Sequence, residues 1–181
     1  MKQIITFLVC TLILLFVGAT SVRADNIAGV SGQLVNSSVK KDDIRVKKLT
    51  AFLAKHNSPL TDQAPVFVAT ADKYGMKDRW AMIAAIAGVE STFGKFIPKN
   101  SYNAWGWGIP TGARSGIGFD NWEDGIETVT KGLKEKYVDR GLTTPEKIMR
   151  VYAPPSHTWA SNVKFFMAKI ENQTIEPELS L

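Results

Sequence analysis

The sequence predicts an all-α domain over residues 42–172, with about six helices and little strand. Apolar residues recur at intervals of three and four residues through most of this range. Residues that cap helices precede these periodic segments, and Gly or Pro follows them. Residues 95–120 lack the helical period and are rich in glycine, so we expect a long loop there, in which a short hairpin is an alternative to irregular structure.

Residues 1–24 have the pattern of a cleavable signal peptide. A basic start precedes an apolar run over residues 4–19, and Val22 and Ala24 place small residues at positions −3 and −1 of a cleavage site. The alternative is an uncleaved membrane anchor, because residues 3–22 carry no charge and are just long enough to span a bilayer. In either case we expect the rest of the chain outside the cytoplasm, in the periplasm or the cell wall.

Composition narrows the function classes. The single cysteine, Cys10, lies in the signal segment, so the mature chain is expected to have no disulfide and no thiol chemistry. Cleavage would lower the formal net charge from +5 to +3, which fits a partly anionic cell wall or ordinary solubility and is too small to indicate nucleic acid. His56 and His157 do not form a zinc motif, so we expect no metal, and no motif for another cofactor is present. We expect the chain to be a monomer.

The first part of the mature chain is predicted to be a tether followed by two helices. Residues 25–41 are rich in Ser, Gly and Asn, a composition typical of a flexible linker. The first helix starts near Asp42 and ends near His56, and the second is capped by Thr61 or Asp62 and closes before a glycine. Their apolar positions are Ile44, Leu49, Phe52, Leu53, Val66, Phe67, Ala69 and Ala71.

The third predicted helix, residues 79–93, is the centre of the domain. Asp78 can cap it, and Gly94 is a typical residue for its C-terminal end. Most of its apolar residues are alanines, whose small side chains allow neighbouring helices to approach closely.

Two helices follow the loop. Asn121 caps the first and Gly141 stops it, while Thr143 or Thr144, followed by Pro145, begins the second. The apolar stripe of the first comprises Ile126, Val129, Leu133 and Tyr137.

A final amphipathic helix and a polar tail complete the chain. Pro154 and Pro155 end the preceding helix, and residues 173–181 form the tail. Trp159 and Trp80 occupy helical positions and are predicted to lie in the core. The other apolar positions of the last helix are Val163, Phe166, Met167 and Ile170.

Glu90 is the candidate catalytic residue. It lies at the end of the alanine-rich helix, just before the glycine- and tryptophan-rich loop. An apolar setting and a helix C-terminus both raise the pKa of a carboxyl group, so this group can stay protonated near neutral pH. A carboxylic acid in that state can protonate a glycosidic oxygen. The structural alternative is a carboxylate paired with a cation such as Lys95.

Asp120 and Tyr152 are the candidate catalytic partners of Glu90. Glycosidic cleavage needs a group that stabilises or traps the positive charge on the sugar. Asp120 either faces the cleft or begins a helix together with Asp124. Tyr152 either directs its phenol into the cleft or is a half-buried core residue.

Five residues in or near the loop are candidates for substrate binding. Trp105, Trp107 and Trp122 offer indole faces on which sugar rings stack, and Asn103 offers an amide for sugar hydroxyls. Ser91, next to the acid, is the fifth. For Trp105 and Trp107 sugar binding and core packing are both open, and one of each is expected.

The order of these motifs resembles a known family. Residues 87–94 resemble the E-S-x-x-G stretch at the acid of lysozyme-like peptidoglycan-cleaving enzymes. Residues 103–109 resemble the N-x-[FW]-G-[IW] segment of the endo-β-N-acetylglucosaminidase-like branch, and residues 119–126 and 152–155 are similar to its aromatic-plus-acidic helix start and its tyrosine segment. The resemblance covers residues 45–172.

The resemblance implies a lysozyme-like fold with a cleft, and cleavage of the β-1,4 glycan strands of peptidoglycan. It implies Glu90 as the general acid/base and Tyr152 near the reacting sugar. Lytic transglycosylases are related but usually have G-L-M-Q at residues 106–109 and Y-N-A-G at residues 152–155, where this chain differs. A single acid is nevertheless what internal attack with formation of an anhydro sugar needs, so hydrolysis and transglycosylation are both open. A non-catalytic peptidoglycan-binding module is a further alternative, against which the presence of Glu90 argues.

Overall fold

The computed structural model describes residues 43–109, 112–113, 116–154 and 156–175. These residues form six α-helices and no strand, which confirms the all-α prediction. The predicted signal segment, the predicted tether and most of the polar tail lie outside the described residues. The helices are α2 (Ile44–Lys55), α3 (Ala64–Lys73), α4 (Met82–Ser91), α5 (Trp122–Lys136), α6 (Pro145–Tyr152) and α7 (Trp159–Glu171).

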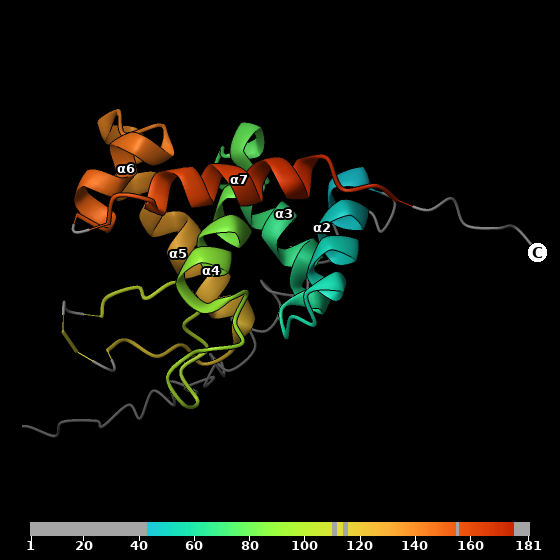
Figure 1. Cartoon of the computed structure of the whole chain (residues 1–181), viewed down its shortest axis with the longest axis horizontal. Coiled ribbons are helices and arrows are strands. Elements are labelled where there is room, and N and C mark those ends of the chain that lie inside the picture. The colour runs from blue at the N-terminus through green and yellow to red at the C-terminus, as the bar shows by residue number, and fades with distance from the viewer. Residues whose placement is uncertain (1–42, 110–111, 114–115, 155, 176–181) are drawn as a thin grey trace, which may run out of the picture.

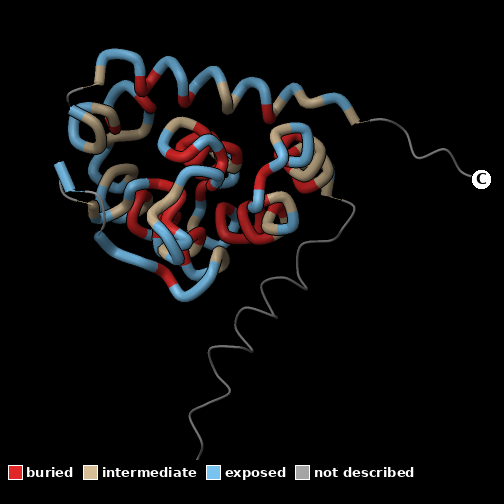
Figure 2. The backbone as a smooth tube through the Cα atoms, turned by 60° about the horizontal axis from the view of Figure 1, so that its bottom comes forward, coloured by how far each residue is buried: buried red, intermediate tan, exposed pale blue. Residues whose placement is uncertain are grey.

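The helices pack around α4. Helix α7 runs across the molecule from α6 at one end to α2 at the other and contacts α4 along its way (Figure 1). Helix α3 packs between α2 and α5. Residues 82–88 of α4 are all buried, and buried backbone gathers in the interior of the helical assembly (Figure 2). The run of alanines in α4 therefore serves as the predicted close-packing surface.

Two predicted helix caps are confirmed. The side-chain oxygen of Asn121 accepts a hydrogen bond from the N–H of Asp124 at 2.8 Å, at the start of α5. At the start of α6, Thr144 accepts from the N–H of Lys147 at 3.4 Å. Each bond satisfies a backbone donor that has no partner inside the helix.

Two other helices begin later than predicted. Thr61 and Asp62 lie in a 3₁₀ turn, Thr61–Gln63, and α3 begins only after it. Asp78 likewise lies in a 3₁₀ turn, Lys77–Arg79, that precedes α4. The polar residues expected to cap α3 and α4 make no cap bond, because the short turns occupy their positions.

Helix α4 ends earlier than predicted, because the chain reverses at Thr92 and Phe93. Both residues have left-handed backbone angles, with φ of 52° and 59°. The N–H of Phe93 donates to the carbonyl of Ala87 at 3.0 Å and closes the helix. The reversal returns the Phe93 ring to the interior, where it packs edge-on against Phe52 and Phe166.

No strand occurs in the described part of the predicted loop, so the short hairpin is not found there. The loop instead folds back on itself, with the N–H of Phe119 donating to the carbonyl of Ser101 at 2.8 Å.

We expect Gly88→Ala to destabilise the fold. A Cβ at this position would lie 2.5 Å from an atom of the Phe93 ring and 3.1 Å from Phe166. Overpacking of this kind costs about 1–3 kcal/mol, more than the ~1 kcal/mol that alanine gains over glycine in a helix. The measurement is the free energy of unfolding by denaturant titration.

The control for this prediction is the same substitution in a Phe93→Leu background. Leucine lacks the two Phe93 ring atoms that a Cβ at position 88 would meet most closely, so Gly88→Ala should cost less stability there, with only the 3.1 Å approach to Phe166 remaining. An equal loss of stability in both backgrounds would contradict the assigned clash.

Candidate active site

Glu90 lies one residue before the end of α4. One of its carboxyl oxygens faces the indole of Trp159, and the other faces the backbone at Gly106. The indole Nε1–H of Trp159 donates to Oε1 at 2.6 Å. The other oxygen, Oε2, lies 3.5 Å from the point that a Cβ on Gly106 would occupy, so it faces the backbone of the loop. Lys95 donates instead to the carbonyl of His56 at 2.9 Å, and the alternative of a Glu90–Lys95 pair is therefore not found.

Burial raises the pKa of the Glu90 carboxyl above its ordinary value. The hydrogen bond from Trp159 opposes this effect, because it stabilises the charged form, but the net shift is upward. Glu90 as a residue is exposed, and its carboxyl is nevertheless desolvated by the protein around it. The direction agrees with that expected for an acid at the apolar end of a helix.

Trp159 has a part in the site that its sequence position did not indicate. It is the first residue of α7, and with 3% of its surface exposed it belongs to the core as predicted. Its ring also lies 5.1 Å from that of Tyr152, at an angle of 32°. A core residue thus connects the acid with a second aromatic side chain.

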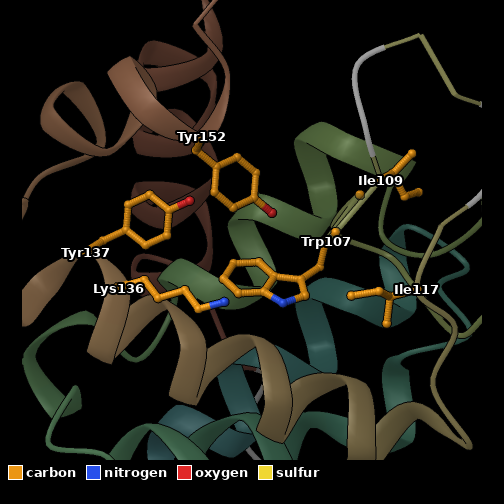
Figure 3. A pocket seen from close by; sticks show the side chains of 8 residues that line it. Trp107, Ile109, Ile117, Lys136, Tyr137 and Tyr152 are labelled. Atoms are coloured by element: carbon orange, nitrogen blue, oxygen red, sulfur yellow. The ribbon is translucent and has the colours of Figure 1, made fainter.

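A pocket of about 260 Å³ lies beside the loop (Figure 3), and Glu90 is not among its lining residues. Two of its lining residues lie near the acid. Gly106 faces Oε2 of Glu90, and the charge of Glu90 contributes to the raised pKa of Tyr152. The loop, the end of α5 and the end of α6 all contribute to its walls. The lining residues are Gly106, Trp107, Gly108, Ile109, Ile117, Lys136, Tyr137 and Tyr152.

The two loop tryptophans have different positions. Trp105 is fully buried, and its indole N–H donates to the carbonyl of Ile83 in α4 at 2.9 Å. Trp107 lines the pocket. Its indole lies so close to α5 that a Cβ on Gly132 would be 2.4 Å from it. Trp105 therefore anchors the loop, and Trp107 presents an aromatic surface to the pocket.

Tyr152 lines the pocket with its ring and holds the loop with its hydroxyl. The hydroxyl donates to the carbonyl of Trp105 at 2.6 Å. Burial, together with the nearby charge of Glu90, raises the pKa of Tyr152 well above its ordinary value. Tyr152 is therefore a neutral hydrogen-bond donor at any physiological pH, and its phenolate is not available to stabilise positive charge.

Asp120 and Trp122 lie away from the pocket. Asp120 is exposed and is not among the lining residues; its N–H donates to the carboxylate of Asp124 at 3.2 Å, at the start of α5. The alternative that Asp120 begins a helix is the one that the structure supports. Trp122 packs edge-on against Tyr102, with ring centroids 5.2 Å apart.

Ser91 and Asn103 were predicted to bind substrate. Both are buried, and their side chains form hydrogen bonds with backbone groups of the protein. The hydroxyl of Ser91 donates to the carbonyl of Ala104 at 2.7 Å. The amide of Asn103 donates to the carbonyls of Trp107 and Ile117 at 2.8 and 2.9 Å. Both residues shape the loop around the pocket, and neither directs a free polar atom into it.

We expect Trp159→Phe to raise the pKa of Glu90. Phenylalanine keeps most of the packing but removes the N–H that stabilises the carboxylate, so the protonated form persists to higher pH. The measurement is an NMR titration of the Glu90 carboxyl carbon. Trp122→Phe, which removes an indole that does not contact Glu90, is the control and should leave the titration unchanged. A lower or unaltered pKa in Trp159→Phe would refute the assigned hydrogen bond.

The described residues contain no helix that could cross a membrane and no cluster of side chains that could hold a metal ion. None of their helices combines the length and the apolar character needed to cross a bilayer. No group of three or more His, Cys, Asp or Glu side chains there could hold a metal ion. The chain matches no protein-family model and no curated protein sequence.

Proposed function

We propose that this protein is a secreted cell-wall glycosidase with a lysozyme-like fold. It would cleave β-1,4 glycosidic bonds of peptidoglycan, with Glu90 as the general acid/base. One observation carries the proposal: a carboxyl group with a raised pKa is oriented by Trp159 beside a pocket with aromatic walls. The predicted signal segment supports a location outside the cytoplasm.

The chemistry begins with proton transfer. A glycan would lie with its sugar rings against Trp107, Tyr137 and Tyr152, whose faces pack on the C–H faces of sugars. Protonated Glu90 would donate its proton to the leaving oxygen as the bond to the anomeric carbon breaks. The resulting carboxylate would then accept a proton from the group that attacks the anomeric carbon, which restores the acid.

Lytic transglycosylation is the second candidate reaction, and the absence of a carboxylate among the described lining residues of the pocket supports it. No Asp or Glu is among the described lining residues, and Asp120 lies away from them. Without a protein carboxylate as nucleophile, the attacking group is either water or a hydroxyl of the substrate. In the latter case the 6-hydroxyl oxygen of the sugar bonds to its own anomeric carbon, its proton passes to Glu90, and an anhydro sugar forms.

We expect Glu90→Gln to abolish cleavage while folding and binding to peptidoglycan persist. The amide has nearly the size of the carboxyl but cannot donate a proton to the glycosidic oxygen, and loss of a general acid typically costs about 10²–10⁴-fold in rate. The measurement is mass spectrometry of fragments released from purified peptidoglycan. Asp120→Asn, a neutralised acid outside the pocket, should remain active.

The products distinguish the two candidate reactions. Reducing ends would indicate hydrolysis and anhydro-muramyl ends transglycosylation. For either reaction, cleavage should decline as the pH rises through the pKa of Glu90, because the proton donor is then lost. Full activity of Glu90→Gln would remove Glu90 from the mechanism, and binding without cleavage by the unmodified protein would favour the binding-module alternative.

A further inference from the structure

Lys136 is the one charged side chain among the described residues that line the pocket. It is the last residue of α5 and is exposed. Its ammonium group lies 5.4 Å from the centroid of the Trp107 ring (Figure 3). Within the described part of the chain no carboxylate pairs with it, whereas the nearby Lys134 pairs with Asp139. The positive charge of Lys136 is therefore not neutralised by the protein.

The position of this charge follows from the packing of α5. Gly132 allows the indole of Trp107 to lie directly against the helix. Lys136 comes four residues later, on the same face of the helix, so its side chain can reach the same indole. A cation–π attraction holds an ammonium near an aromatic ring without cancelling its charge. A positive charge therefore lies at the edge of the aromatic wall of the pocket.

We propose that Lys136 binds a carboxylate of the glycan and makes the site select acidic amino-sugar strands over neutral ones. The inference rests on the proposed function and names the substrate class of that same pocket. Strands of peptidoglycan carry carboxylates from two sources, the lactyl group of the muramyl sugar once its peptide has been removed, and the acidic residues of attached peptides. A chain of β-1,4-linked N-acetylglucosamine alone carries none.

The test measures binding in the Glu90→Gln background, where cleavage does not interfere. Three ligands are compared by calorimetry at low salt: a neutral N-acetylglucosamine tetrasaccharide, a peptidoglycan tetrasaccharide with free lactyl carboxylates, and the same tetrasaccharide with its peptides. The variants are Lys136→Met, which keeps the length of the side chain and removes its charge, and Lys131→Met, an exposed lysine of α5 outside the pocket, as control.

We expect Lys136→Met to weaken binding of an acidic ligand about two- to fivefold, as for an exposed ion pair, and to leave the neutral ligand unaffected. The effect should shrink at high salt, because salt screens exposed charges. A loss confined to the ligand with free lactyl carboxylates identifies the sugar as the source, and a loss confined to the peptide-bearing ligand identifies the peptide. Lys131→Met should alter none of the three affinities.

Two results would overturn the inference while leaving the proposed function intact. One is an equal loss of affinity for neutral and acidic ligands, which would indicate an apolar contact only. The other is no change with any ligand. Failure of the Glu90→Gln protein to bind any of the three glycans would contradict the proposed function itself and the role of Lys136 with it.

Discussion

The burial of Trp105 is the constraint on which the rest of the site depends. Its indole is fully enclosed and donates a hydrogen bond to the carbonyl of Ile83, so the loop is fastened to the central helix. Its own carbonyl accepts the hydroxyl of Tyr152, which fastens the end of α6 to the same point. Because Gly106 and Trp107 follow directly in the chain, this anchor determines where the pocket lies relative to Glu90.

The environment of Glu90 balances two opposite effects on one carboxyl group. Desolvation raises its pKa, and the N–H of Trp159 limits the rise. A raised pKa extends the pH range over which the carboxyl group keeps the proton that a general acid must donate. Exposure of the residue leaves a path for a substrate, and the aromatic walls of the adjoining pocket provide surfaces on which sugars can stack.

Local sequence signals predicted the helices well and the site only in part. Periodicity and caps such as Asn121 are local, so they located the starts of α5 and α6 correctly. The end of α5 was placed too late, because a 3₁₀ turn, Val138–Arg140, lies between Lys136 and the predicted stop at Gly141. The early end of α4 depends on the distant packing partners of Phe93. Glu90, Trp107 and Tyr152 were identified from their local setting and lie at or beside the pocket. The role of Trp159 was missed because its contact joins residues 69 positions apart, and Lys136 was missed because only the fold brings it to Trp107.

In the proposed function, Glu90 and the aromatic pocket together form one site that cleaves a glycan. The most direct measurement is a crystal structure of the Glu90→Gln protein with a bound peptidoglycan tetrasaccharide. We expect a sugar ring against Trp107 and a glycosidic oxygen about 2.6–3.2 Å from the side chain at position 90. A glycan bound on another face, or in the pocket with no glycosidic oxygen near position 90, would contradict the proposed function.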